Sequence, residues 1–334
     1  MKNFWSLLML FTVAYVSAQE DYFVGQSRFL QKVNPSYFGF NNLNKVGVLY
    51  NTLQINSGQT IDNKYFFGAL SFDEKKFSLG IDLNSFRIDT PGLTQNNFTL
   101  SYVYKVQLNN NLFFLPAISL GIGSVKYNAQ GFIFEDQLDQ ATGFINTETN
   151  DPAGFNLIDV NYFDLGASFI VHNENFLIGL SLKNLNQPNV SFSPEREELR
   201  KVKLTLSGAY EFNINEYERS VIPRHSYLLL YGSLANFNNA QYLSLSEEVQ
   251  FGEFSLGISQ QLSNVETINL NNIGMSVGLS LENFDFGIFY NFPIRQASRV
   301  FSPSIFELNL IFNFSQFRRN NRGLYKRLQT DNYF

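Results

Sequence analysis

Two histidines, His172 and His225, are the residues of this chain that come closest to catalytic chemistry. An acyl-transfer site needs a serine, a histidine and an acid that converge where the substrate lies. Neither histidine has such partners near it in the sequence, and the pair lacks the ligand spacing of a zinc site. We therefore expect both histidines to serve turns or strand entry, and we expect the protein not to be an enzyme.

Acidic side chains gather between residues 128 and 161, and closely spaced carboxylates can bind calcium. They are Glu135, Asp136, Asp139, Glu148, Asp151 and Asp159. Their spacing does not fit a calcium-binding loop, and the chain has no phosphate loop or dinucleotide fingerprint. The absence of cysteine excludes thiolate metal sites and disulfides. We expect neither a metal nor a cofactor. We interpret the stretch as a solvated outside loop, and its phenylalanines suit a loop that folds over the opening of the protein or into its lumen.

Strand signals surround these residues, and the clearest lie between Lys76 and Tyr127. Residues 77–84 alternate apolar with polar or small side chains, and the same two-residue period returns at residues 97–107 and 118–123. Such a period gives a strand one apolar face and one polar face. Each segment has about ten residues, which is the length that a tilted strand needs to cross a bilayer.

Segments of this kind recur along the whole chain. They are residues 45–55, 63–72, 76–88, 97–107, 112–125, 162–171, 176–183, 201–212, 226–235, 241–250, 254–261, 272–281, 284–292 and 304–314. We predict an all-β protein, a transmembrane outer-membrane β-barrel of about fourteen antiparallel strands. The mean hydropathy of −0.12 agrees, because a barrel keeps half of its strand side chains away from lipid. A soluble β-sandwich would also alternate, and a periplasmic solenoid would need a fixed repeat, which the chain lacks.

The lengths of the connections favour the barrel over the sandwich. Transmembrane barrels have short periplasmic turns and longer outside loops. After even-numbered strands the connections are short, at residues 73–75, 108–111, 172–175, 251–253 and 282–283. After odd-numbered strands they include the long residues 128–161, 184–200, 262–271 and 293–303. One even connection, residues 213–225, is long and breaks the rule.

The two ends of the chain differ from the barrel segments. Residues 1–18 have the basic start, apolar core and small-residue cleavage site of a secretory signal peptide, which predicts a mature chain from Gln19. An uncleaved anchor helix is the alternative, although the apolar run is short for a span. We expect residues 19–44 to form a periplasmic N-terminal segment, residues 45–314 the barrel, and residues 315–334 a basic periplasmic tail. That tail is either a solvated segment or a docking segment.

The charge distribution limits the partners. The net charge of −5 argues against a nucleic-acid binder, which would usually be basic. The predicted inward-facing positions carry few charges, among them Lys105, Glu211, Asp285 and Glu307. Porins line a constriction with opposed charges, and we find no such cluster. A plugged or partner-occupied barrel is therefore favoured over an uptake channel.

Short motifs make the chain resemble a known family, the PorP/SprF outer-membrane proteins of the type IX secretion system of Bacteroidota. Residues 34–39, Asn-Pro-Ser-Tyr-Phe-Gly, are similar to the family's Asn-Pro-Ala-Tyr-Ala-Gly segment. Residues 185–192 contain its Leu-Asn-Gln-Pro run, and the last strand has its inward Glu, here Glu307. The basic tail ends in Tyr-Phe as in the family, with Asn332 where Arg is usual. The first strand departs from the family's Tyr-Arg-x-Gln-Trp pattern and keeps only Tyr50 and Gln54.

The resemblance implies a non-enzymatic outer-membrane barrel that assists secretion or surface anchoring of a large protein with a C-terminal sorting domain. The implied partners are that secreted surface protein, the periplasmic and outer-membrane components of the secretion machinery, and outer-membrane lipid. A channel for uptake of small or hydrophobic solutes is the alternative. The residues that the motifs suggest for partner binding are Asn34, Pro35, Tyr37, Gly39, Gln187, Pro188, Asn189, Phe192, Arg318, Arg319, Tyr333 and Phe334.

Overall fold

The computed structural model describes residues 23–42, 44–56, 59–72, 75–89, 92–127, 159–192, 197–215, 221–223, 226–237, 240–264, 268–281, 283–294 and 304–314. The predicted signal peptide, the basic tail, His225 and most of the acidic stretch at 128–161 lie outside these residues.

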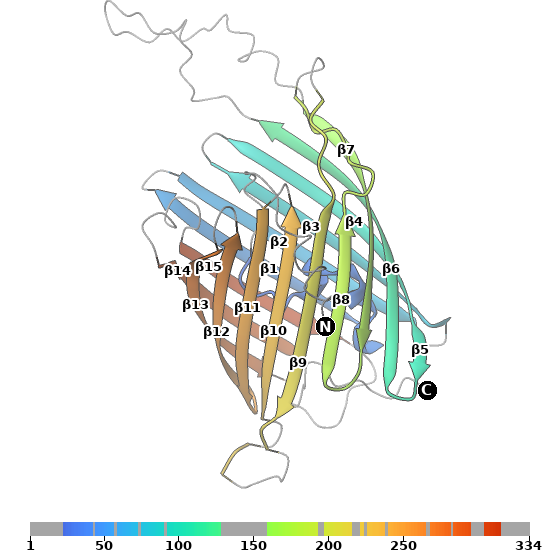
Figure 1. The fold of residues 1–334 in the computed structure, drawn as a ribbon, viewed down its shortest axis with the longest axis vertical. Coiled ribbons are helices and arrows are strands. Elements are labelled where there is room, and N and C mark those ends of the chain that lie inside the picture. Colours follow the sequence, from blue (N-terminus) through green and yellow to red (C-terminus); the bar gives the residue numbers. More distant parts are fainter. Residues whose placement is uncertain are drawn as a thin grey trace, which may run out of the picture.

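Strands dominate the described chain, and each pairs antiparallel with its neighbours (Figure 1). Their bounds are β1 Lys45–Asn56, β2 Gln59–Phe72, β3 Phe77–Ile88, β4 Leu93–Tyr104, β5 Val106–Asn109, β6 Leu112–Tyr127, β7 Val160–His172, β8 Phe176–Lys183, β9 Lys203–Asn213, β10 Tyr227–Phe237, β11 Ala240–Phe251, β12 Phe254–Asn264, β13 Ile268–Leu281, β14 Phe284–Pro293 and β15 Ser304–Asn313. Two short helices, α2 (Leu30–Val33) and η2 (Pro35–Asn42), precede β1.

The sheet closes on itself. Its order runs from β4 through β1 to β15 and on to β6 and β5, and β4 also pairs with β6. Because β4 and β5 are separated only by Lys105 and both pair with β6, they are two parts of one wall strand. The fifteen labelled segments of the described chain therefore form a closed barrel of fourteen antiparallel strands, which confirms the prediction. The break at Lys105 is a detail that the pattern did not show.

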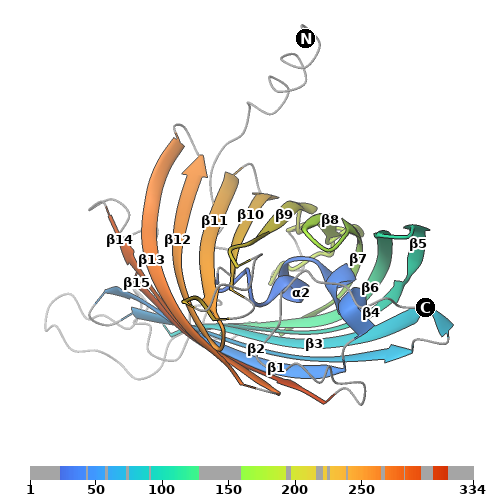
Figure 2. The same cartoon turned by 90° about the horizontal axis from the view of Figure 1, so that it is seen from below.

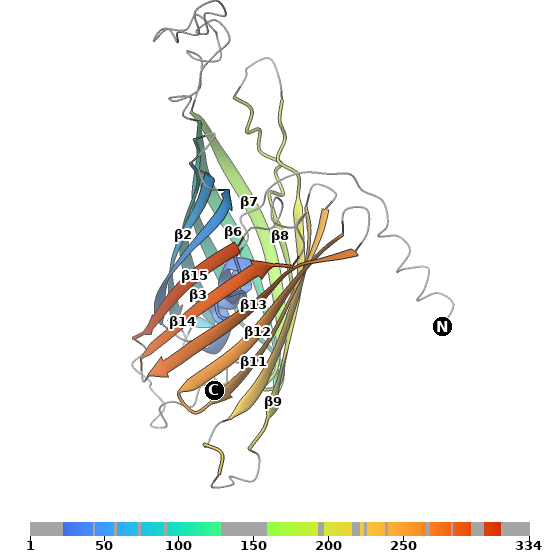
Figure 3. The same ribbon diagram turned by 90° about the vertical axis from the view of Figure 1, so that its left-hand side faces the viewer.

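Alternation places the apolar face of each strand outside. Ile81, Leu100 and Ile122 are exposed on neighbouring strands, whereas Ser78, Ser101 and Ser119 are buried on the opposite face. So large a contiguous apolar surface is stable in lipid and would drive association in water. Figure 3 shows the tilt of the strands that carry these side chains. No helix in the described part of the chain is long and apolar enough to span a membrane.

The N-terminal segment is the part of the fold that differs from expectation. Its described part, residues 23–42, lies inside the barrel and not beneath it, with α2 enclosed by the strands (Figure 2). We call residues 23–42 the plug. Its aromatic and aliphatic side chains form one core with inward-facing residues such as Tyr65, Phe67 and Leu115. The physical reason is the hydrophobic effect, because the burial of this many apolar side chains lowers the free energy of the folded protein.

Candidate functional site

The candidate functional site is the contact between the plug and the wall. One part of it is a carboxylate on β15. Glu307 is fully buried and points inward. Its Oε2 accepts the backbone N–H of Val24 at 2.8 Å, and its Oε1 accepts that of Gly25 at 2.9 Å. Hydrogen bonds to a charged acceptor are about twice as strong as neutral ones. Glu307 thus holds the beginning of the plug against the last strand.

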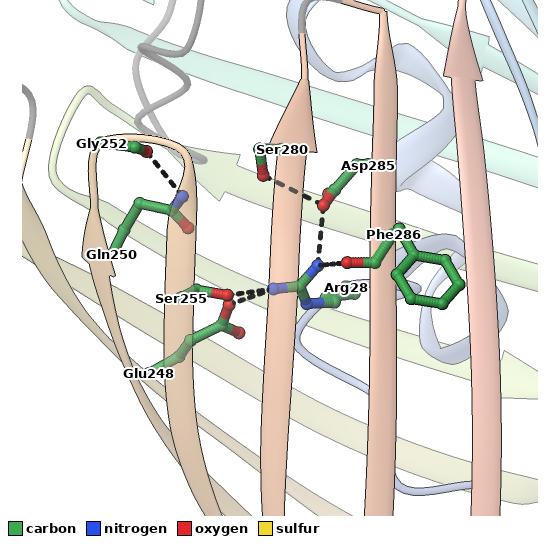
Figure 4. A network of polar contacts seen from close by, with 8 residues as sticks. All are labelled: Arg28, Glu248, Gln250, Gly252, Ser255, Ser280, Asp285 and Phe286. Atoms are coloured by element: carbon green, nitrogen blue, oxygen red, sulfur yellow. Dashed lines mark hydrogen bonds and ion pairs between the residues drawn. The ribbon is translucent and has the colours of Figure 1, made fainter.

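A second contact joins Arg28 of the plug to three strands (Figure 4). Its Nη2 lies 2.6 Å from Oε1 of Glu248 on β11, and its Nη1 lies 2.7 Å from Oδ1 of Asp285 on β14. The guanidinium also donates to Ser255 on β12 and to the carbonyl oxygen of Phe286, at 3.1 Å for the latter. The side chains of Arg28 and Glu248 are only 1% and 2% exposed, so the loss of one would leave the other's charge buried without this partner.

Two wall glycines make room for plug side chains. A Cβ on Gly278 of β13 would overlap the Arg28 guanidinium, and a Cβ on Gly80 of β3 would overlap the Phe38 ring. Both plug residues therefore approach the wall backbone more closely than any larger wall residue would permit.

We expect Gly80→Ala to destabilise the folded barrel by about 1–3 kcal/mol, because the added methyl group forces Phe38 out of its place. The effect is measured as a lower midpoint concentration in unfolding by guanidinium chloride. Gly208→Ala is the matched control, since a Cβ there would meet only a backbone oxygen at 3.6 Å. Combining Gly80→Ala with Phe38→Leu should restore part of the loss, and an additive double variant would contradict the assignment.

The Asn-Pro-Ser-Tyr-Phe-Gly motif lies in the plug and contacts the wall. Asn34 Nδ2 donates to the carbonyl oxygens of Phe169 (3.1 Å) and Leu180 (3.3 Å), and the hydroxyl oxygens of Ser36 and Ser168 are 2.8 Å apart. Asn34 and Tyr37 are buried. The residues predicted to bind a partner, Asn34, Pro35, Tyr37 and Gly39, are thus buried within the barrel in this structure, and Asn34 hydrogen-bonds to its wall.

His172 also contributes to the plug contact. It is the last residue of β7, fully buried, with its ring 4.6 Å from Phe40 of the plug and 5.4 Å from Phe113. The sequence predicted a turn or strand-entry role; the structure places His172 at the end of β7, beside the turn to β8, where its ring packs against the plug. Among the described residues, no group of three histidine, cysteine or acidic side chains could hold a metal.

The Leu-Asn-Gln-Pro motif is far from the plug in the sequence and forms the start of the β8–β9 connection. Asn186 Oδ1 accepts the N–H of Leu165 at 3.0 Å, and its Nδ2 donates to the carbonyl of Phe163 at 2.6 Å. Asn186 therefore takes over the pairing of β7 where β8 has ended. Beyond it, the carbonyl of Pro188 accepts the N–H of Arg200, and Asn189 bridges to Leu199.

The remaining predicted site residues fall into three situations. Gln187 and Asn189 are exposed on this connection, and Pro188 is buried. Phe192 lies 6.2 Å from the ring of Tyr127 at the same end of the barrel. Arg318, Arg319, Tyr333 and Phe334 lie outside the described residues. The structure therefore does not bring the plug motif and the loop motif into one site.

We expect Asn186→Ala to loosen the β8–β9 connection, because two hydrogen bonds of about 1 kcal/mol each are lost. Hydrogen exchange at the Leu165 amide should speed up by about tenfold or more. Gln187→Ala, which changes an exposed neighbour, is the control. Unchanged exchange at Leu165 in Asn186→Ala would show that the connection does not depend on this side chain.

Sequence reasoning missed Arg28 and Glu248. A signal was present for Arg28, since it is one of two cations, with Lys32, in a segment rich in aromatic residues that precedes a barrel with inward acids at Asp285 and Glu307. Glu248 adjoins Glu247, and only the strand register decides which of the two faces inward.

Comparison with known proteins supplies the context for this site. The family model described as "Type IX secretion system membrane protein PorP/SprF" matches residues 16–312. No curated protein matches the chain.

Among solved structures, a FadL homologue of Pseudomonas aeruginosa shares 8% identity, with coverage of 84% of this chain and 93% of that one and a TM-score of 0.49. The TodX monoaromatic hydrocarbon channel, as a deletion mutant, shares 11% identity over 86% and 93% of the two chains, with a TM-score of 0.47. Omp33 of Acinetobacter baumannii shares 10% sequence identity over 83% of this chain and 100% of its own, with a TM-score of 0.44.

Proposed function

Because the chain belongs to the PorP/SprF family of type IX secretion system membrane proteins, we propose that it assists the secretion or surface anchoring of a large protein with a C-terminal sorting domain. As a member of this family with a closed barrel and an apolar outer surface, the protein is an integral outer-membrane protein. We further propose that it works without enzymatic activity, in contact with other components of the secretion machinery.

The single observation that carries this proposal beyond family membership is the filled lumen. The plug is bound to strands on several sides by Glu307, Arg28 and Asn34. A barrel built for free diffusion of solutes needs an open passage, as sixteen- to eighteen-stranded porins have. A barrel that recruits a partner needs a stable scaffold and exposed loops, which this chain offers.

Two surfaces are proposed for partners. The β8–β9 connection, with exposed Gln187 and Asn189, would contact the secreted protein together with the acidic stretch at 128–161. The basic tail, with Arg318, Arg319, Tyr333 and Phe334, would contact the secretion machinery on the periplasmic side. The plug residues Asn34, Pro35, Tyr37 and Gly39 would become available to a partner only after leaving the lumen.

A pull-down of the tagged protein from outer membranes tests the proposal. Recovery of one large surface protein is expected. A photo-crosslinker in place of exposed Gln187 should capture that protein, whereas one in place of exposed Lys75, in the short β2–β3 connection, should not. A protein recovered without a large partner and with steady conductance in planar bilayers would instead identify a solute channel. Crosslinks to the substrate from the tail alone would contradict the assignment of the loops.

A further inference from the structure

A cavity of about 160 Å³, with several charged side chains in its lining, lies in the lumen between the plug and the wall. Its walls come from α2 and the start of η2, from β2, β3, β4 and β6 to β9, and from the connection between β8 and β9. The charged side chains that line it are four cations and two carboxylates, namely Lys32, Lys183, Arg200, Lys203, Asp82 and Asp164. The cavity lining is therefore net positive, in a protein whose overall charge is −5.

Three of the cations contact neutral acceptors. Lys183 Nζ donates to the backbone carbonyl of Lys32 at 3.0 Å, and Lys32 Nζ donates to the Asn84 amide oxygen at 3.1 Å. Arg200 donates to the Tyr162 hydroxyl at 2.7 Å and to Gln95 Oε1 at 3.1 Å. These contacts orient the cations around the cavity. The carboxylates of Asp82 and Asp164 also attract these cations, so the two acids offset part of the positive charge and the lining stays net positive. All three lysines of this cavity, Lys32, Lys183 and Lys203, also line an adjoining cavity of about 80 Å³.

An independent observation comes from the plug. Gln31, on α2, lines the larger cavity and is 1% exposed. Neither its amide nitrogen nor its amide oxygen has a hydrogen-bond partner among the described residues. A buried amide without partners is unfavourable, so a group that accepts a hydrogen bond from the Gln31 amide nitrogen inside the cavity would be stabilised there.

We propose that this cavity is a binding site for a small oxyanion of the carboxylate or phosphate type. Lys183 and Lys203 of the wall and Lys32 of the plug supply the positive charge, and Gln31 Nε2 supplies a neutral donor. The volume suits a small anion with a few waters, since one water occupies about 30 Å³ of liquid. An anion held by both wall and plug stabilises the docked plug, because a ligand that binds one state favours it. This inference does not depend on the role in secretion.

Calorimetric titration of the purified full-length protein tests the site. Sodium phosphate and sodium acetate are titrated separately at constant ionic strength in chloride, and saturable single-site binding of at least one is expected. Phosphate binding alone assigns a phosphate-type ligand, and acetate binding alone assigns a carboxylate. Absence of saturable binding for both anions would overturn the proposal.

Substitutions then locate the site. The double variant Lys183→Gln/Lys203→Gln should bind about ten- to hundredfold more weakly, as expected for lost hydrogen bonds to charged groups. Lys126→Gln is the matched control, because Lys126 is exposed and pairs with Asp159 away from the cavity. An equal loss in the control would mean unspecific charge attraction and would refute the site. Should the double variant fail to fold, Gln31→Leu decides, with weaker binding expected and unchanged binding as the contrary result.

Discussion

Replacing Arg28 by alanine is expected to release the plug. The substitution leaves Glu248, with a side chain only 2% exposed, without the guanidinium that it pairs with at 2.6 Å. Removing one partner of a buried ion pair typically costs about 3–5 kcal/mol, which corresponds to a shift of about 10²- to 10⁴-fold in the docking equilibrium. Arg28→Lys should show an effect between those of the parent and Arg28→Ala. A lysine ammonium keeps the positive charge but lacks the two guanidinium nitrogens that reach two carboxylates at once.

The absence of cysteine makes this release measurable. A single cysteine at Ser36, which is fully buried against Ser168, should react with a membrane-impermeant maleimide only when the plug has left. In the Arg28→Ala background the labelling rate should rise with the undocked fraction. Arg87→Ala is the control, because the Arg87–Asp89 pair is exposed and contributes little. Equal labelling of the parent and Arg28→Ala would show that the ion pairs do not hold the plug.

The second large effect is expected from Glu307→Ala. Two buried backbone N–H groups, those of Val24 and Gly25, would lose a charged acceptor. Each such bond contributes about 1.5–3 kcal/mol, so hydrogen exchange at these amides should accelerate by about 10²-fold or more. Glu307→Gln keeps one acceptor oxygen and should show a smaller effect.

Glu253→Ala is the control for this experiment, since Glu253 is exposed in the turn between β11 and β12. Exchange at the amides that join β1 and β15 separates loss of the plug from loss of the barrel. If those amides stay protected while Val24 and Gly25 exchange, the carboxylate acts on the plug. If Val24 and Gly25 remain protected in Glu307→Ala, the carboxylate is dispensable for plug docking.

The barrel could be predicted from the sequence because its signal is local. The two-residue period in β3 or β6 follows from neighbouring side chains facing lipid and lumen in turn, and the structure places Ile81 and Ile122 outside as that period requires. The strand ends were less predictable. β4 begins at Leu93 and not at 97, because pairing with β3 and β6 continues beyond the alternating residues.

The plug could not be predicted in the same way. Its apolar residues, such as Phe29, Leu30 and Phe38, follow no single period, since they contact different strands around an enclosing wall. A segment of this composition does indicate burial, yet the sequence does not reveal which surface buries it. The inward acids Asp285 and Glu307 were visible as candidates, whereas their partners in the plug depend on contacts across more than two hundred residues.

The position of Glu307 has a consequence for the order in which the molecule assembles. Glu307 lies on β15, which closes the ring by pairing with β1. Its carboxylate binds Val24 and Gly25, which precede it in the chain by 283 and 282 positions. Contacts between such distant residues require the largest loop-closure entropy and are expected late in folding. The plug is translated before the barrel strands, and it is bound by the last of these strands to be translated. We therefore expect closure of the seam and docking of the plug to be coupled, because both depend on β15.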